Sequence, residues 1–206
     1  RTVELEPKAM KLYKQFEKES FAELADSEVS AMNILTKMLR LSQMTGGHLT
    51  DDEGDTTAVS MAKLDALSDI LDTMLVIMAR FVPELNDIQK LLEKKNIGYA
   101  SVRGGISNRA EEIRRFQNDA DCRVFVGQIA AAGLGITLTA ASTMVFYSLD
   151  YSMSNFEQAK ARIHRVSQTE NCLYIYLTAK NTVDAKILRS LRDKVDLART
   201  LVDDYR

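Results

Sequence analysis

The sequence predicts an α/β fold in which helices cover both faces of a doubly wound, mainly parallel sheet, preceded by an all-helical segment. From about residue 60, helix-like segments alternate with short apolar runs, the pattern of a parallel sheet with covering helices. Runs such as RVFVG (123–127) are apolar throughout, which is typical of strands buried on both faces. Before residue 60, apolar residues recur instead at helical spacing.

Two helices are expected in the N-terminal part. In the first, Pro7 suits a first helical turn, and an apolar stripe follows at Leu12, Phe16, Phe21 and Leu24. The second is expected over residues 28–43, with TGG (45–47) as a plausible stop and a stripe at Val29, Met32, Leu35, Met38, Leu39 and Met44.

Residues 45–58 are expected to form an exposed loop. Its acidic DDEGD run lacks the ligand spacing of a calcium loop, and His48 has no second candidate ligand nearby. We therefore predict no metal site, and we divide the chain into a helical segment with its acidic loop (1–58) and an α/β lobe (59–206).

Five strands and five helices are expected in the lobe. The strands are 75–79, 99–102, 123–127, 144–148 and 173–178. The helices are 61–73, 83–95, 108–119, 154–166 and a long last helix from about Val183.

Composition bounds the classes of function. With 206 residues, 46% of them hydrophobic, the chain can bury one substantial core. The net charge of −2 provides no overall positive field, so any contact with DNA must come from a local patch.

Cys122 and Cys172 lack CxxC partners and are expected to be reduced packing residues. The chain has no long apolar run and no charged-then-apolar leader, so a cytoplasmic location without membrane contact is expected. A first residue other than methionine suggests a fragment of a longer protein.

Two strand-to-helix loops carry candidate chemistry, because ligands of open α/β sheets bind at the carboxyl ends of the strands. After 123–127, Gly133 and Gly135 allow backbone conformations barred to other residues, although a tight turn explains them equally well. After 144–148, the spacing of Gln158, Arg162 and Arg165 places them on one face of a helix. Guanidinium groups match phosphate oxygens, while an exposed basic helix face is the simpler explanation.

The neighbouring sequence favours the phosphate-binding explanation of these arginines over an exposed basic helix face. QAKARIHRVSQ resembles motif VI of the Swi/Snf-type superfamily II helicases, with matches at Gln158, Ala159, Arg162, His164, Arg165 and Gln168. AAGLGITLTAAS is similar to motif V of that family, RGGIS with Arg109 and RRFQND to motif IVa, and VIMARFVPEL to motif IV. The resemblance covers nearly the whole chain, and phage or prophage members look closest. Departures are Ser167 for the usual Gly, Tyr151 for Trp and Arg103 for Asp.

The resemblance implies a RecA-like C-terminal lobe of an ATP-dependent DNA helicase or translocase. It implies Arg162 and Arg165 as catalytic arginine fingers and Gln158, Gly133 and Gly135 as nucleotide-binding residues. It implies sequence-independent contacts with DNA from Arg80, Gly104, Gly105, Gln128 and Thr139. His164 would be structural or coupling rather than a general base.

The same resemblance implies a partner. The chain has no GxxxxGK[ST] loop and no acidic pair for magnesium, so an N-terminal RecA-like lobe of the same polypeptide would hold ATP and Mg²⁺. This lobe alone is therefore expected to be inactive. Two other classes stay open, a RecA-like interaction module that has lost its ATPase role and a nucleotide-sugar transferase lobe.

Overall fold

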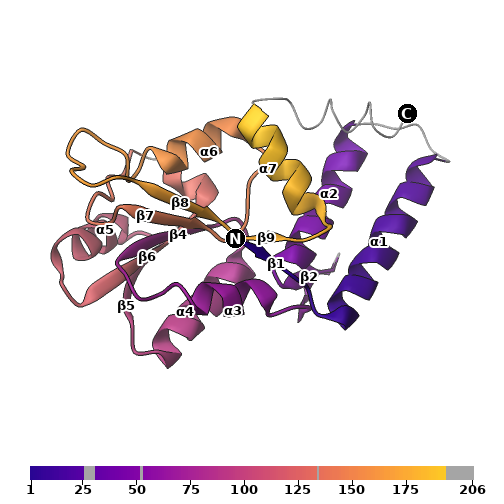
Figure 1. The fold of residues 1–206 in the computed structure, drawn as a ribbon, viewed down its shortest axis with the longest axis horizontal. Helices are drawn as coiled ribbons and strands as arrows, with labels where there is room; N and C mark the ends of the chain where they lie inside the picture. The colour runs from indigo at the N-terminus through magenta and orange to yellow at the C-terminus, as the bar shows by residue number, and fades with distance from the viewer. Residues whose placement is uncertain (26–30, 52, 134, 194–206) are drawn as a thin grey trace. The chain divides into compact units, whose positions relative to one another are not determined.

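The chain forms two compact units in the computed structural model, which describes residues 1–25, 31–51, 53–133 and 135–193 (Figure 1). The sheet unit comprises Arg1 and Leu64–Leu177, and the helical unit comprises Thr2–Lys63 together with the chain from Thr178. This division differs from the expected one at 58/59, because the C-terminal helix belongs with the N-terminal segment.

The sheet unit is built on five parallel strands. They are β4 (Leu75–Ala79), β5 (Gly98–Val102), β6 (Cys122–Gln128), β7 (Thr143–Phe146) and β8 (Leu173–Tyr176). Their spatial order is β5-β6-β4-β7-β8, which runs from bottom to top on the left of Figure 1. All five expected strands are confirmed with small shifts at their ends. The central strand β4 is fully buried along its whole length, as its uniformly apolar sequence requires.

Helices cover both faces of this sheet. They are α3 (Ala62–Ser68), α4 (Val82–Lys94), α5 (Arg109–Asn118) and α6 (Met153–Lys160). Phe125 of β6 and Phe146 of β7 are in register with Val76 and Met78, which lie two residues apart on β4 and so point to the same face. Phe116 of α5 packs on Phe125, and Phe156 of α6 packs on Phe146, with ring centroids 5.5 and 5.2 Å apart.

Helix α4 covers the opposite face. The connection through α4 moves across the sheet in one direction, while those through α5 and α6 move in the other, and parallel crossovers are right-handed. The fold is therefore a doubly wound α/β sheet, as expected. The two cysteines are free thiols, and burial raises the pKa of Cys122.

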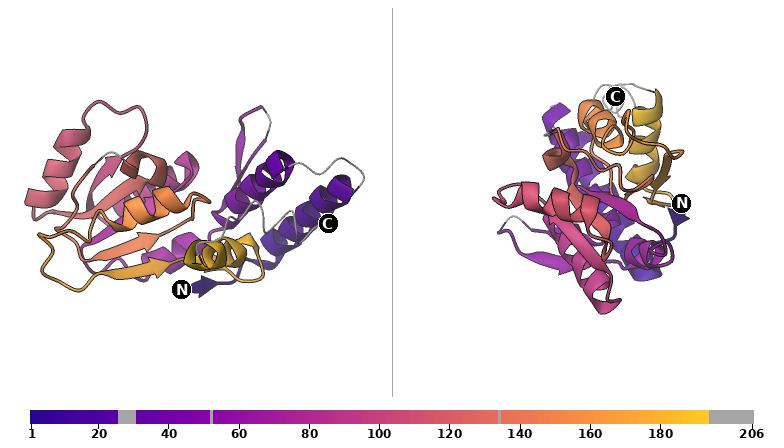
Figure 2. Two further views of the ribbon diagram at one scale, coloured as in Figure 1. Left: turned by 90° about the horizontal axis from the view of Figure 1, so that it is seen from above. Right: turned by 90° about the vertical axis from the view of Figure 1, so that its left-hand side faces the viewer.

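The helical unit contains the remaining elements. They are β1 (Thr2–Val3), α1 (Pro7–Ala25), α2 (Ala31–Thr45), β2 (His48–Thr50), β3 (Thr56–Ala58), β9 (Thr178–Ala179) and α7 (Val183–Asp193). β1 pairs in parallel with β9, which brings the two ends of the described chain together. Tyr13 of α1 is fully buried, and its hydroxyl accepts a hydrogen bond of 2.9 Å from the Val183 backbone nitrogen. The views in Figure 2 show α1, α2 and α7 from two further sides.

Two expectations for this unit were wrong. The stripe of α1 is not the expected one, because Leu12 is 42% exposed while Ala9 and Tyr13 are buried. Residues 45–58 are not a loop throughout, because β2 and β3 form an antiparallel hairpin and α2 continues to Thr45. His48 begins β2 and is buried rather than exposed. Parts of the expected stripes, including Val29, lie outside the described residues.

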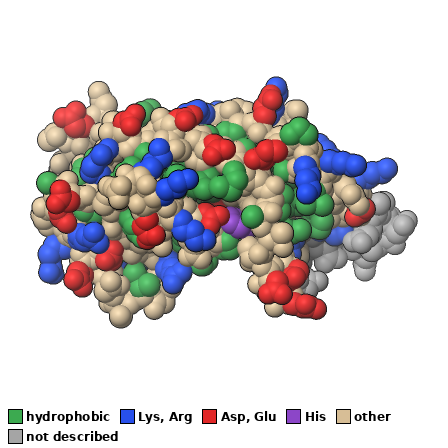
Figure 3. All heavy atoms as spheres, turned by 90° about the horizontal axis from the view of Figure 1, so that it is seen from below, with side chains coloured by type: hydrophobic (Ala, Val, Ile, Leu, Met, Phe, Trp, Pro, Cys, Tyr) green, Lys and Arg blue, Asp and Glu red, His purple; other side chains and the backbone are tan. Residues whose placement is uncertain are grey.

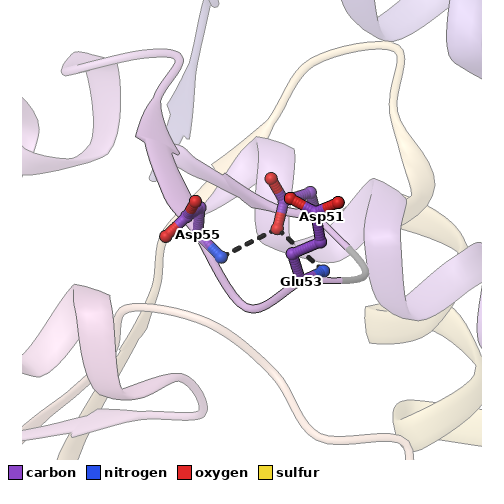
Figure 4. A group of neighbouring side chains, drawn as sticks. All are labelled: Asp51, Glu53 and Asp55. Carbon is purple, nitrogen blue, oxygen red and sulfur yellow. Dashed lines mark hydrogen bonds between the residues drawn. The ribbon is translucent and has the colours of Figure 1, made fainter.

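The tip of this hairpin carries the acidic run. Asp51 Oδ1 accepts hydrogen bonds from the backbone nitrogens of Glu53 and Asp55 at 3.1 and 2.7 Å, which closes the turn (Figure 4). The carboxylates of these three residues lie within 4.8 Å of one another and are exposed. Figure 3 shows acidic side chains gathered there, and on the sheet unit it shows both signs of charge interspersed. The Asp51 carboxylate closes the turn, whereas Glu53 and Asp55 take part in it through their backbone nitrogens.

Candidate functional site

The candidate site lies at the carboxyl ends of the parallel strands, around the point where the strand order reverses between β4 and β7. A buried carboxylate organises this point. Glu84 of α4 accepts hydrogen bonds from the backbone nitrogens of Arg80 and Phe81 at 3.2 and 3.1 Å. Ser148, which follows β7, donates to the same oxygen at 2.5 Å and accepts from the Arg80 nitrogen at 2.8 Å. Glu84 and Ser148 therefore fix the end of β4 beside that of β7.

The side chain of Arg80 lies along this edge. Its guanidinium stacks on the Tyr151 ring, 4.1 Å from the centroid, and its Nε is 4.0 Å from Asp150. Tyr151 thus provides the aromatic platform expected at a position where the resembling family usually has Trp. With 18% of its side chain exposed, Arg80 is held mainly by protein groups.

Three of the residues expected to contact DNA are linked by one side chain. Gln128, at the end of β6, donates from Nε2 to the Arg80 carbonyl at 3.3 Å and accepts at Oε1 from the Gly104 nitrogen at 3.1 Å. Gly105 is next in the chain, and its φ of +82° is a conformation that favours glycine. Thr139 lies elsewhere, with its hydroxyl 3.5 Å from Gln117 Nε2 of α5. The structure therefore brings four of the five residues together.

The glycines after β6 differ from each other. Gly133 ends a 3₁₀ helix, η1 (Ile129–Gly133), whereas Gly135 has a φ of +68°. A Cβ added at Gly135 would meet no atom within 4 Å, so backbone conformation and not space explains a glycine there. Gly135 therefore has a conformation that favours glycine, whereas Gly133 is part of the 3₁₀ helix.

The arginines do not share a helix face with Gln158, so that expectation was wrong. α6 ends at Lys160, and Ala161 is its C-cap. Tyr174 donates its hydroxyl to the Lys160 carbonyl at 3.0 Å, and the Leu138 nitrogen donates to the Arg162 carbonyl at 2.9 Å. Because other elements satisfy these carbonyls, the helix has no need to continue. Gln158 remains on α6, where its side chain bonds Ser154 at 3.0 Å.

Arg162 is a buried cation that forms no ion pair with any residue the structure describes. Its side chain is buried, and within the described residues its Nε has no hydrogen-bond partner. Burial and the neighbouring positive charge of Arg165 both lower the pKa of the Arg162 guanidinium, which still remains charged at neutral pH. A buried charge of this kind is costly unless an anion is supplied from elsewhere.

Arg165 is exposed and is oriented by the backbone. Its Nε donates to the Ala161 carbonyl at 3.1 Å and its Nη2 to the Ile136 carbonyl at 3.3 Å. The second of these bonds joins the arginine loop (161–168) to the segment after Gly135. Two arginines, one buried and one exposed, thus lie beside each other on one loop.

Gln168 is a residue whose role the sequence did not disclose. From Nε2 it donates to the carbonyls of Thr139, Ala141 and Ile163 at 3.3, 3.0 and 3.3 Å. It therefore fastens the arginine loop to residues 139–141. The match of Gln168 to motif VI was the sequence signal for this residue. The spacing of residues in the sequence cannot predict that its amide would donate to three backbone carbonyls.

His164 points to another part of the surface. It lines a cavity of about 330 Å³ with Glu157, Lys160, Ala161, Cys172 and Tyr174. Lys160 lies over the rings of Phe156 and Tyr174, 5.2 and 5.5 Å from their centroids. A larger cavity of about 500 Å³ lies along the edge strand β5 and is lined by Tyr99, Ser101 and Arg103 among others.

Comparison with known proteins identifies the family of this chain. Residues 62–167, about half of the chain, match the model of the family described as the helicase conserved C-terminal domain. The chromatin-remodelling ATPase INO80 of Drosophila melanogaster is 38% identical over 97 residues, which cover 47% of this chain and 6% of that protein. The chain therefore spans a small part of that relative's length.

Two solved structures share the fold. The C-terminal part of the Fun30 ATPase domain superposes with a TM-score of 0.76 at 16% identity, covering 92% of this chain and 86% of that one. The Sulfolobus solfataricus SWI2/SNF2 ATPase core in complex with dsDNA gives a TM-score of 0.75 at 24% identity, covering 93% and 42%. Within the described ranges, no helix has the length and apolar character needed to cross a membrane. The chain belongs to the helicase conserved C-terminal domain family, and its relatives agree with a Swi/Snf-type lobe.

Proposed function

We propose that this chain is the C-terminal half of an ATP-dependent DNA translocase or helicase motor and that it supplies the arginines that promote hydrolysis. The observation that carries the proposal is the buried guanidinium of Arg162, whose Nε lacks a partner within the described residues and which lies beside the positive charge of Arg165. Two neighbouring positive charges, one of them buried, repel each other, and a bound polyanion would stabilise both.

A nucleoside triphosphate fits these donors. When bound, it supplies the phosphoryl group that is transferred to water, a reaction that asks the protein mainly for positioning and charge stabilisation. Arg162 and Arg165 would contact the phosphoryl oxygens from this lobe, Gln158 would help to sense the phosphates, and Gly133 and Gly135 would line the cleft. ATP and Mg²⁺ would be held mainly by an N-terminal RecA-like lobe of the same polypeptide.

The linked residues Arg80, Gly104, Gly105 and Gln128 would follow a DNA strand. Backbone nitrogens and short polar side chains grip phosphates without reading bases, so the contact would not depend on sequence. Thr139 would contribute separately, from the segment that Gln168 fastens to the arginine loop. A structural neighbour determined in complex with dsDNA supports this part of the proposal.

The experiment is an ATPase assay on two proteins. One is this chain alone, and the other, the two-lobed protein, is this chain following an N-terminal lobe with a phosphate-binding loop. We expect no hydrolysis above background from the chain alone and DNA-stimulated hydrolysis from the two-lobed protein. Arg162→Ala should abolish the stimulated rate while ATP still binds, because the other lobe does most of the ground-state holding.

The same assay distinguishes the proposed motor from a RecA-like interaction module without ATPase activity. Absence of DNA-stimulated hydrolysis from the two-lobed protein, or hydrolysis unaffected by Arg162→Ala, would contradict the proposal. The first outcome would favour an interaction module that has lost its ATPase role.

A further inference from the structure

We propose that helix α5 transmits DNA contact at the β5–α5 turn to the arginine loop, with Arg109 and Gln117 as its positioning residues. The inference rests on the proposed function and deepens it, because it names the element that would make hydrolysis depend on DNA. It is carried by the hydrogen bonds that α5 makes to the chain on either side of residue 134, at Ala131 and at residues 135–140, which are here together called the cleft segment.

Helix α5 holds the cleft segment at both ends. Arg109, the first residue of α5, donates from Nη2 to the Ala131 carbonyl in η1. Gln117, near the other end of α5, accepts at Oε1 from the Ala140 nitrogen at 2.8 Å and reaches the Thr139 hydroxyl at 3.5 Å. The two residues lie about 12 Å apart along the helix, at about 1.5 Å per residue. Because both contacts come from one helix, the position of α5 determines the positions of both ends of the segment.

The cleft segment in turn holds the arginine loop. Its carbonyl at Ile136 accepts from Arg165, and its nitrogen at Leu138 donates to the Arg162 carbonyl. A shift of the segment must therefore move both arginines or break these bonds. In this way α5 acts on the arginines without touching them.

Helix α5 begins, at Arg109, directly after the turn that would meet DNA. Gly104, Gly105 and Asn108 lie in this turn and are exposed, and Gly104 is linked through Gln128 to the end of β4. Arg103 precedes them and is also exposed. Within the described part of the chain its guanidinium has no hydrogen bond or ion pair, so it is available for a phosphate.

Helix α5 is held to the sheet by Phe116 and by Glu112, which accepts a hydrogen bond from the Ser101 backbone nitrogen at 2.8 Å. Phe116 lies near the C-terminal end of the helix and packs on Phe125 of β6. Arg109 Nε is buried and has no hydrogen-bond partner among the described residues, so the guanidinium keeps a donor for a second position of η1. Coupling between two sites needs an element with two arrangements that both sites can bias.

The first measurement is steady-state hydrolysis by the two-lobed protein with and without saturating duplex DNA. Gln117→Leu removes the acceptor for the Ala140 nitrogen, and Arg109→Met removes the donor to Ala131 while keeping an apolar stem. In each variant we expect the DNA-stimulated to basal ratio to fall about tenfold, within the range usual for coupled sites. The basal rate, the KM for ATP and the Kd for DNA should change little.

Two variants serve as controls. Gln117→Glu keeps the acceptor for the Ala140 nitrogen and should keep most of the stimulation. Arg114→Ala removes an exposed charge from the same helix and should behave as wild type. Stimulation that is unchanged in both Gln117→Leu and Arg109→Met would overturn the inference, as would equal loss of the basal and stimulated rates.

The second measurement uses this chain alone and needs no hydrolysis. Saturating duplex DNA should change amide hydrogen exchange within residues 135–141 of the wild-type chain, and Gln117→Leu should abolish that change. If DNA binds but leaves exchange in this segment unaltered, α5 does not transmit the contact. Failure of the ATPase alone, with the exchange response intact, would instead count against the proposed function.

Discussion

Lys63 Nζ lies 2.6 Å from Asp184 Oδ2, and both side chains are almost completely buried in the helical unit. The same carboxylate accepts hydrogen bonds from the Thr45 hydroxyl and the Ala179 backbone nitrogen, each at 2.8 Å. One acidic group thus joins the end of α2, the start of α3, β9 and α7. This junction explains why α7 belongs with the N-terminal helices and not with the sheet.

Removing one member of this pair should destabilise the helical unit strongly. Lys63→Met leaves the Asp184 carboxylate buried without its counter-ion, and we expect the free energy of unfolding to fall by about 3–5 kcal/mol. The double variant Lys63→Met with Asp184→Asn should recover much of the loss, because no uncompensated charge remains. Denaturant unfolding followed by circular dichroism measures all three proteins.

A matched control lies on the surface. Lys180 pairs with Glu4 at 2.9 Å, with side chains 58% and 77% exposed, so Lys180→Met should cost less than about 1 kcal/mol. Equal losses from Lys63→Met and Lys180→Met would show that the buried pair does not hold this junction.

The sheet was predictable because its signals are local. Leu75–Ala79 is uniformly apolar and forms the central strand, and the helices around it appear where apolar residues recur at helical spacing. The hairpin after α2 was missed because Thr56–Ala58 has no apolar alternation and is exposed along its length. What forms this hairpin is the Asp51 turn, which periodicity does not detect.

The sequence selected the candidate residues, but it did not predict how the structure arranges them. Motif resemblance selected Arg162 and Arg165, which the structure places on one loop after α6. It could not show that α6 ends before them, because that end depends on Tyr174 and Leu138, which come from other parts of the chain. The roles of Ser148 and Gln168 are likewise set by long-range hydrogen bonds.

This chain alone should bind duplex DNA weakly and without sequence preference. Its net charge is −2, so binding depends on a few local phosphate contacts, and affinity should fall steeply between about 50 and 200 mM salt. Arg103→Ala should weaken binding to all sequences and lower the slope of log affinity against log salt by about one. Fluorescence anisotropy with two unrelated duplexes measures both quantities, with Arg114→Ala as the charge-matched control.

Tight, salt-insensitive binding to one of the duplexes would contradict contact through the DNA backbone. A salt slope that Arg103→Ala and Arg114→Ala lower equally would show that Arg103 contributes only overall charge.

Arg165 should be needed for turnover and not for nucleotide binding. In the two-lobed protein, Arg165→Ala should cut DNA-stimulated hydrolysis by roughly 10³-fold while ATP affinity changes little. Arg165→Lys should rescue little, because Arg165 uses Nε and Nη2 to hold the carbonyls of Ala161 and Ile136 and keeps further donors for a phosphate. An ammonium group at the end of a flexible stem cannot do both.

The control for Arg165 must be chosen from the structure. Lys160, adjacent in the motif, is unsuitable because it packs over Phe156 and Tyr174, so its loss would disturb the end of α6. Arg114 is exposed on α5 and has the same charge, so Arg114→Ala should retain near-normal turnover. Steady-state kinetics beside a nucleotide-binding titration separates the two roles of Arg165. If Arg165→Ala kept its turnover but lost ATP affinity, Arg165 would hold the ground state and would not act as a finger.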